Sequence, residues 1–208
     1  MSGGRVSIPP VPPLPPGVKP SYPVEIDWEH PLAKGLAGVV VFGSNTYPNL
    51  ADNQLYTNEG GEQKPDGIEF DATGSDYVSL DSNPDLVDLA HGDFTVFTRI
   101  YPHTTGESST GRICNKRPTG NTGGFLFFTD NTASLGFQTV SGAGAVLAHQ
   151  RGADNAITLN DWNNVAFTFS DSGDRKAHIY VEGSEISYDT DTAGGSQAGS
   201  DSGQFFTI

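Results

Sequence analysis

The sequence has few of the residues on which several protein classes depend. It contains one cysteine, Cys114, so no intrachain disulfide can form and we expect a buried free thiol. Lysine and arginine together number 11 against 25 acidic residues, which gives a formal net charge of -14. Because nucleic-acid binding needs clustered cations that displace counterions, this charge argues against a nucleic-acid partner. No run reaches the ~18 consecutive apolar residues of a membrane-spanning helix, so we expect no membrane partner.

Proline, by contrast, is concentrated at the N-terminus. Eight of the 14 prolines lie before residue 24, and apolar residues are interleaved with them. Since proline fixes φ and removes the backbone donor, residues 1–23 are expected to form an extended polyproline II arm that cannot join a sheet. The arm is either a stiff linker or tail, or a docking segment that buries its apolar residues against a partner. The residues predicted to dock are Ile8, Pro9, Pro10, Val11, Pro12, Pro13, Leu14, Pro15, Pro16 and Val18.

The rest of the chain, residues 24–208, is dominated by short alternating segments. Residues 162–183 predict a complete antiparallel hairpin, because 165–169 alternate apolar and polar side chains, the acidic run 171–174 turns the chain, and alternation resumes at 178–181. Glycine occurs 26 times and long helical patterns are lacking, which favours an all-β fold. The other expected strands are 36–42, 67–71, 77–80, 93–101, 112–116, 124–129, 134–140, 145–149, 157–159 and 204–207, with a short one around 54–57.

One of these strands, 93–101, has apolar residues on both faces. Phe94 and Val96 alternate to one side, whereas Phe97 and Tyr101 alternate to the other. This pattern predicts a central strand that is covered on both faces.

Two segments resemble the concanavalin A-like, laminin G-like domains. They are the hairpin WNNVAFTFSDSGDRKAHIYVEG at 162–183 and the upstream segment FDATGSDYVSL at 70–80, which is followed by FTV at 94–96. The resemblance covers residues 36–208 and implies a two-sheet antiparallel jelly-roll sandwich. This sandwich hosts lectins, hydrolases, adhesion modules and viral coat parts, so the fold alone does not choose a function.

The segment DWEHPLAKGL at 27–36 resembles the opening of laminin G-like domains encoded in tailed-phage genomes. That resemblance, the Pro-rich arm and the lack of a signal-peptide pattern predict a non-enzymatic virion structural protein, a capsid decoration or fibre-associated sandwich. Such a protein would be assembled in the host cytoplasm, form a homo-oligomer, and bind capsid or other virion proteins through its arm. The alternative is a carbohydrate-binding, lectin-like module for surface glycans, with Tyr47, Tyr56, Tyr101 and Tyr188 as candidate stacking platforms.

Catalytic patterns are lacking. Hydrolases of this sandwich fold carry the pattern E-x-D-x-x-E on one strand, and this chain has no such run. Its nearest carboxylates, Glu182 and Glu185, flank a turn where solvated charge is expected. The sequence also contains no G-x-S-x-G elbow and no H-x-x-x-H pair. We therefore predict that the protein is not an enzyme.

Calcium is the one cofactor that the resemblance makes possible, because many laminin G-like sandwiches hold it with loop carboxylates. Asp76 is the leading candidate ligand, since it precedes the family-like Tyr77-Val78. No D-x-D-x-D-G loop is present, so the alternative is solvated surface charge. The other loop carboxylates considered are Asp71, Asp171, Asp174, Asp189 and Asp191.

The C-terminus carries a further expectation. In the domains that this chain resembles, an "FTI" strand is followed by another apolar strand, whereas this chain stops at Ile208. We expect the edge beside residues 36–42 to be covered by a neighbouring subunit, another virion protein or residues of a longer natural chain, because an open edge invites aggregation.

Overall fold

The computed structural model describes residues 29, 35–39, 56–64, 67–71, 76–80, 86–106, 110–117 and 122–208. The chain divides into two compact units, residues 1–36 and 37–208, and the strands of the described residues lie in the second. The predicted Pro-rich arm, residues 1–23, lies outside the described residues, as does the phage-like segment except for residues 29, 35 and 36.

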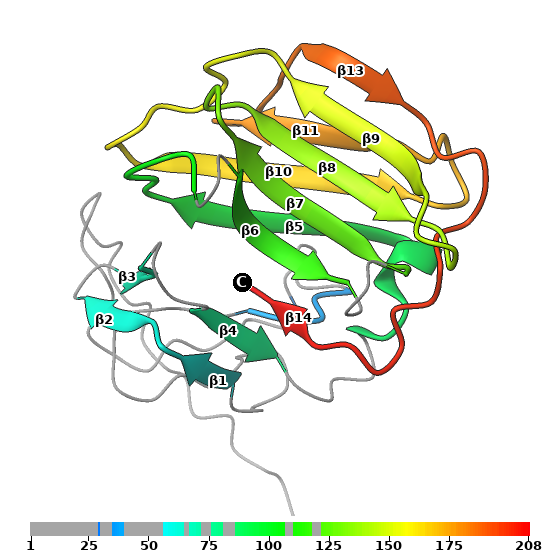
Figure 1. The fold of residues 1–208 in the computed structure, drawn as a ribbon, viewed down its shortest axis with the longest axis horizontal. Helices are drawn as coiled ribbons and strands as arrows, with labels where there is room; N and C mark the ends of the chain where they lie inside the picture. The colour runs from blue at the N-terminus through cyan, green and yellow to red at the C-terminus, as the bar shows by residue number, and fades with distance from the viewer. Residues whose placement is uncertain are drawn as a thin grey trace, which may run out of the picture. The chain divides into compact units, whose positions relative to one another are not determined.

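The second unit is built from antiparallel sheets, as the sequence predicted (Figure 1). The larger sheet has eight strands in the order β1-β4-β14-β6-β7-β8-β9-β13, and the smaller has four in the order β12-β11-β10-β5. A separate two-stranded sheet pairs β2 with β3. The bounds are β1 Tyr56–Glu59, β2 Glu62–Lys64, β3 Gly67–Glu69, β4 Tyr77–Leu80, β5 Asp93–Ile100, β6 Thr110–Lys116, β7 Phe125–Asp130, β8 Leu135–Val140, β9 Val146–Gly152, β10 Asn163–Ser170, β11 Ala177–Val181, β12 Ser184–Glu185, β13 Tyr188–Thr192 and β14 Phe206–Thr207.

A short 3-10 helix, η3 (Leu89–His91), precedes β5. Within the described part of the chain, no helix has the length and apolar character required to span a bilayer.

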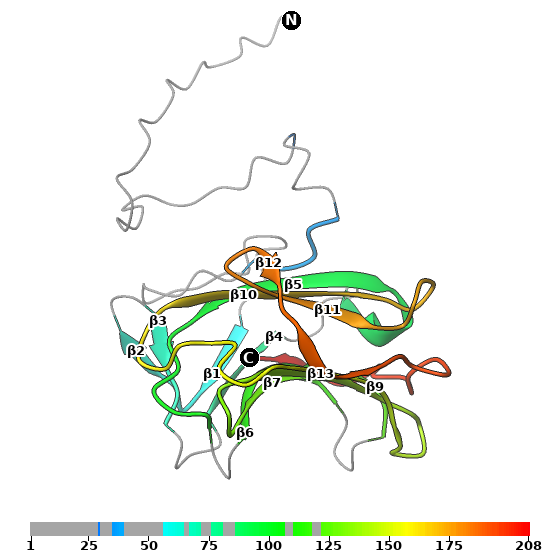
Figure 2. The same ribbon diagram turned by 90° about the horizontal axis from the view of Figure 1, so that it is seen from above.

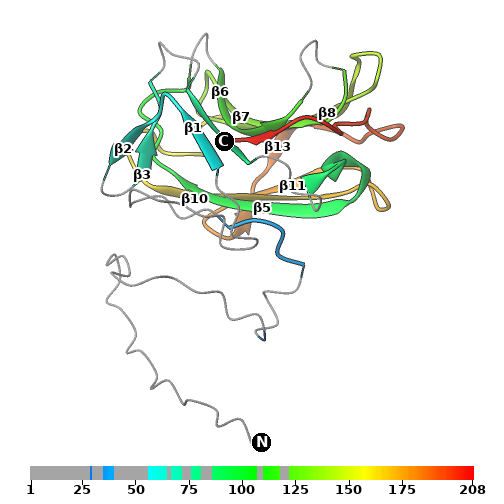
Figure 3. The same cartoon turned by 90° about the horizontal axis from the view of Figure 1, so that it is seen from below.

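The two main sheets pack face to face around a core of phenylalanine rings (Figures 2 and 3). Phe167 on β10 contacts Phe127 and Phe137 of the larger sheet, with ring centroids 4.9 Å apart in both pairs. Phe94 on β5 contacts Phe125 at the same separation. Each such pair contributes about 0.5–1.5 kcal/mol beyond the area it buries, so the alternating phenylalanines of the sequence join the layers. The two-layer jelly-roll prediction is confirmed.

The hairpin predicted at 162–183 is present. Strands β10 and β11 pair in antiparallel register, with Phe167 opposite Ile179 and Val165 opposite Val181. Each of these four side chains faces the core, as the alternation required.

Strand β5 does not match its prediction. It lies at the end of the described four-stranded sheet, and its side chains alternate between half-buried and exposed. Phe97 is 70% exposed, because its side of the smaller sheet carries no second layer of described residues. The prediction that both faces are covered is therefore wrong.

Two other differences follow from local sequence. Residues 188–192, expected to be loop, form edge strand β13, whose polar alternation of Asp and Thr carries no apolar signal. Residues 157–159, expected to be a strand, form a connection in which Ile157 is buried and its N–H donates to the Ala133 carbonyl.

The C-terminal strand lies inside the larger sheet. Phe206 pairs with Leu80 of β4, Thr207 pairs with Asn115 of β6, and Ile208 exchanges two backbone hydrogen bonds with Val78. Residues 36–39 are not part of a strand, and residues 40–42 lie outside the described residues. The expectation that this edge is covered by another chain stays a prediction.

Candidate functional site

The outer face of the larger sheet carries a row of side chains that are polar except for one leucine. Register places one residue from each of seven adjacent strands side by side across the sheet. Leu80 follows Ser79 and Phe206 precedes Thr207, and both side chains point into the core. Because successive residues of a strand face opposite sides, the row points away from the core. Figures 2 and 3 show that this sheet is bowed with its outer face concave. In order from β4 to β13, the row is Ser79, Thr207, Asn115, Leu126, Gln138, His149 and Thr192.

Two members of this row have side chains available for a ligand. Within the described residues, neither the Gln138 amide nor the His149 imidazole has a hydrogen-bond partner, although both residues are half-buried. Burial, with a smaller contribution from the charge of Arg151, lowers the pKa of His149, so the ring is neutral at pH 7. A neutral imidazole has one donor and one acceptor, and a glutamine amide offers both.

Where β14 and β6 meet in this row, an amide and a hydroxyl are already paired. Asn115 Nδ2 donates to Thr207 Oγ1 at 2.6 Å, and Thr207 Oγ1 donates to the Asn115 carbonyl at 3.3 Å. This pairing fixes the Asn115 side chain and leaves its Oδ1 as an acceptor on the outer face.

A second row beside the first is built around an aromatic ring. Phe128 on β7 is flanked by Arg112 on β6 and by Gly136 on β8, and Arg151 on β9 pairs with Gly136. The Phe128 ring lies over Gly136, where a Cβ would overlap it. Gly136 therefore provides the space that lets a large apolar ring lie on the outer side of the sheet.

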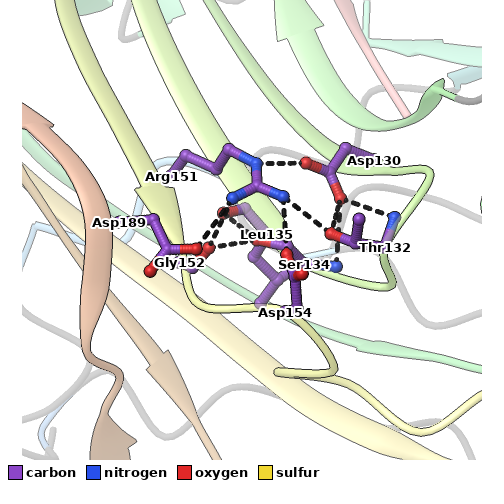
Figure 4. A network of polar contacts seen from close by, with 8 residues as sticks. All are labelled: Asp130, Thr132, Ser134, Leu135, Arg151, Gly152, Asp154 and Asp189. Carbon is purple, nitrogen blue, oxygen red and sulfur yellow. Dashed lines mark hydrogen bonds and ion pairs between the residues drawn. The ribbon is translucent and has the colours of Figure 1, made fainter.

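Arg151 closes one end of this second row (Figure 4). Its guanidinium donates to Asp130, to Asp154 at 2.8 Å and to Asp189 at 3.0 Å, and also to Thr132 Oγ1 at 2.7 Å. These acceptors come from the last residue of β7, the β7–β8 turn, the segment after β9, and β13. Arg151 is thus a structural clamp whose donors are already used.

An aromatic cluster on the smaller sheet is an alternative candidate for the ligand-binding surface. The rings of Tyr101 and Trp162 are 5.3 Å apart, and the Arg99 guanidinium lies over the Trp162 ring, 4.7 Å from its centroid. Because a cation already occupies one face of Trp162, less of this cluster is free to stack on a ligand. Of the predicted sugar platforms, only Tyr101 belongs to this cluster.

The other predicted tyrosines do not form a platform. The Tyr188 hydroxyl accepts from the Ile179 N–H at 2.7 Å and donates to Glu185 at 3.0 Å, and its ring packs against the core. Tyr47 and the side chain of Tyr56 lie outside the described residues, like every predicted docking residue from Ile8 to Val18.

The predicted calcium ligands are engaged by the protein itself. Asp76, the leading candidate, accepts from the Asp71 N–H at 3.0 Å and lies against Gly60. Asp171 contacts Arg175, Asp189 contacts Arg151, and Asp191 contacts Lys176. No group of three or more His, Cys, Asp or Glu side chains with metal-binding geometry occurs among the described residues.

Glu182 and Glu185 are surface residues, but they are not simply solvated. Glu182 accepts from the Asn164 N–H at 2.7 Å and from Asn164 Nδ2 at 2.9 Å. Glu185 contacts His178 Nδ1 at 2.8 Å, and His178 Nε2 contacts Asp174 at 3.1 Å. Both side chains are exposed, as expected of solvated charge, and their hydrogen bonds also join the turn after β11 to β10 and β12 to β11.

His178 gives the fold a pH-dependent contribution. The hydrogen bond to Glu185, and a further one to Asp174, raise the pKa of His178 above its ordinary value of about 6.5. A raised folded-state pKa stabilises the fold at pH values below the unfolded-state pKa, and this stabilisation is lost as pH rises through the folded-state pKa.

We therefore expect His178→Gln to lower the melting temperature more at pH 5.5 than at pH 8.5. Thermal unfolding of both proteins at the two pH values checks this. An equal difference at both would show that the imidazole contacts contribute through packing and not through charge.

The sequence analysis did not predict the polar row, because functional residues were expected in loops and not on strands. The expected strands 112–116, 134–140 and 145–149 contained Asn115, Gln138 and His149, but only Gln138 is out of phase with the apolar residues of its strand. Only the cross-strand register aligns them, and register is not readable from one sequence.

Comparisons with known proteins agree with this architecture. The model of the concanavalin A-like lectin/glucanases superfamily matches residues 72–208. The binding domain of Paraclostridial Mosquitocidal Protein 1 is 12% identical, with a TM-score of 0.55 over 82% of this chain and 46% of that chain. The chain thus spans about half the length of that structure.

Two further solved structures match with lower TM-scores. The carbohydrate binding module CBM66 from Bacillus subtilis is 19% identical, with a TM-score of 0.46 over 80% of this chain and 90% of that one. The native heptameric SAP-like pentraxin from Limulus polyphemus is 20% identical, with a TM-score of 0.37 over 57% of this chain and 51% of that one. No curated protein sequence matches the chain. On the match to residues 72–208, the chain belongs to the concanavalin A-like lectin/glucanases superfamily.

Proposed function

We propose that the protein is a non-catalytic carbohydrate-binding module, and that the outer face of its larger sheet is the binding surface. The observation that carries the proposal is the polar row in which Gln138 and His149 have no hydrogen-bond partner among the described residues. These groups sit side by side in register, on a face that is not used by the core.

The chemistry of the row suits sugar hydroxyls. Each hydroxyl both donates and accepts, and the row offers neutral groups of both kinds at Asn115, Gln138 and His149. Leu126 lies between Asn115 and Gln138 and offers an apolar contact for the C–H face of a ring. A shallow, neutral and rigid surface of this kind binds a polar ligand at low entropic cost.

Two considerations support binding over hydrolysis. Glycoside hydrolysis generally needs two carboxyl groups on either side of the scissile bond, and the polar row contains none. Asp130, which lies on the same side of the sheet beside Phe128 and Arg151, is held by Arg151, Thr132 and Ser134. The superfamily itself takes its description from lectins and glucanases, which fits a carbohydrate ligand.

The proposal is tested by screening the full chain against a panel of oligosaccharides and measuring affinity for the best ligand. We expect Gln138→Ala and His149→Ala each to weaken binding about three- to tenfold, because a neutral hydrogen bond contributes about 0.5–1.5 kcal/mol. His103→Ala, which changes an exposed imidazole beyond the end of β5, is the matched control and should leave affinity unchanged.

Melting temperatures of the variants must stay close to that of the unchanged protein for the comparison to hold. If both outer-face variants bind as tightly as the unchanged protein, the surface has been assigned wrongly. If no oligosaccharide binds, the proposed function fails.

The arm supports a second proposal, that the protein is a virion component docked through residues 1–23. The support is compositional: eight prolines interleaved with apolar residues make a stiff, apolar segment suited to a protein partner. This role is compatible with glycan binding, since a particle-borne module would present the concave face to surface glycans.

Deleting residues 1–22 is expected to leave the melting temperature nearly unchanged and to abolish incorporation into virus particles. Co-sedimentation with particles and thermal unfolding give the two readouts. Normal incorporation of the truncated protein would contradict the docking role, and loss of folding would show that the arm is part of the core.

A further inference from the structure

Strand β6 and the residue that directly follows it carry two arginines on the outer face of the larger sheet. Arg112 pairs with Phe128, which lies on the outer side, and a bulge at Ile113 follows before Asn115 joins the polar row. Alternation from Asn115 through the buried Lys116 places Arg117 on the same side. Arg112 and Arg117 therefore flank Asn115 along the chain, on the outer side of the sheet.

These two arginines differ from the other cations of the described chain. Neither has a carboxylate partner or a side-chain hydrogen bond among the described residues. The protein has 25 acidic and 11 basic residues, so an arginine without an acidic partner is unexpected on composition alone. The other described cations are Lys64, Lys116, Arg151, Arg175 and Lys176, which form ion pairs, and Arg99, which lies over Trp162.

Arg117 is also held in an unfavourable environment. Its Nε is buried and has no hydrogen-bond partner, which is unfavourable for a buried donor. Burial, and next the charge of Arg112, lower the pKa of Arg117. Two like charges and an unsatisfied buried donor, with no compensating contact, are features that an anion would relieve.

Arg151 gives the contrast within the same face. Three carboxylates and a threonine hydroxyl saturate its donors, so it is a clamp and not a binding group. The carboxylates near the second row accept hydrogen bonds from Arg151, whereas the guanidinium groups of Arg112 and Arg117 have no carboxylate acceptor among the described residues.

We propose that Arg112 and Arg117 bind an oxyanion carried by the saccharide, so that the module recognises an acidic glycan. The inference rests on the proposed function and adds a substrate class to it. A carboxylate of a uronic acid and a sulfate or phosphate ester share the required chemistry, a planar or tetrahedral oxyanion that accepts two N–H bonds from a guanidinium. Asn115 lies between the two arginines and belongs to the polar row, so one ligand can place its anion at β6 and its hydroxyls across β7 to β9.

The first test uses inorganic sulfate alone with the full chain, at constant ionic strength. Sulfate should raise the melting temperature, and the increase should disappear in Arg112→Gln and Arg117→Gln. Arg99→Gln, on the smaller sheet, is the matched control and should keep the increase. Because Arg117 has an unsatisfied donor, Arg117→Gln without sulfate should melt at the same temperature as the unchanged protein or higher. A clear decrease would show that Arg117 is structural and would overturn the proposal.

The second test separates the possible anions and the proposed function. Affinities are measured for oligogalacturonate, its methyl ester, a dextran sulfate fragment and dextran. We expect at least one acidic probe to bind ten times more tightly than its neutral counterpart, and Arg112→Gln or Arg117→Gln to remove that preference. A preference for oligogalacturonate identifies a carboxylate, and one for dextran sulfate identifies a sulfate ester.

Failure of the acidic-glycan proposal and failure of the carbohydrate-binding function give different results. Equal binding of neutral and acidic probes, unaffected by the arginine variants, would overturn the inference and leave the proposed function standing. Stabilisation by sulfate that depends on the arginines, with no saccharide bound, would support the anion site and contradict the proposed function.

Discussion

Replacing Lys116 with methionine is expected to lower the free energy of unfolding by about 3–5 kcal/mol, as breaking a buried ion pair does. Lys116 Nζ lies 2.9 Å from Asp201 Oδ1 and 2.8 Å from the Asp201 carbonyl, and the two side chains are 3% and 0% exposed. Burial raises the pKa of Asp201, which Lys116 counteracts. Without the ammonium, a carboxylate would be buried with no partner on Oδ2 and one fewer on Oδ1.

Urea unfolding at pH 7 measures this loss. The double variant Lys116→Met/Asp201→Leu should recover much of it, because two apolar groups leave no unpaired charge. The single variant should be less impaired at acidic pH, since its Asp201 pKa is raised further and the protonated carboxyl is neutral. A loss below about 1 kcal/mol would mean that the pair contributes little to the junction of β6 with the C-terminal segment.

Gly124→Ala is expected to destabilise the same junction by about 2–5 kcal/mol. Gly124 has φ +69°, which costs about 1–2 kcal/mol for a residue with a Cβ, and an added Cβ would overlap the Lys116 carbonyl oxygen. A backbone oxygen cannot move aside as a flexible side chain can, so overpacking adds about 1–3 kcal/mol. The Gly124 N–H also donates to Gly199 and would be displaced.

Gly142→Ala is the matched control, because nothing lies within 4 Å of its added Cβ. It should change the free energy of unfolding by no more than about 0.5 kcal/mol. If the two variants unfold at the same urea concentration, the close approach of β6 and residue 124 is not rigid.

The sequence predicted those parts of the fold where one face of a strand is apolar. The alternation at Val165, Phe167 and Phe169 identified β10, and the same rule identified its partner β11. Strand β13 lacked that signal because, after Tyr188, it contains only Asp and Thr, which an edge strand tolerates. Strand β5 was wrongly predicted to be covered on both faces for the opposite reason, since Phe97 is apolar and yet exposed.

The candidate site could not be predicted, because it depends on register and on pairing across strands. Asn115, Gln138 and His149 come from three strands and meet only through the ladder. The distinction between Arg151 and Arg112 likewise depends on which carboxylates the fold brings near each one. The sequence did indicate that acidic residues are in excess. An arginine without a carboxylate partner is therefore unexpected, and such an arginine points to a ligand.

We propose that the concave outer face of the larger sheet binds carbohydrate. Amide chemical-shift mapping of the 15N-labelled full chain, with a saturating concentration of the best-binding oligosaccharide, tests it most directly. We expect the largest shifts on β6 to β9, at Asn115, Gln138 and His149, with the Gln138 side-chain amide among them. Shifts confined to the smaller sheet, around Phe97 and Trp162, would contradict it.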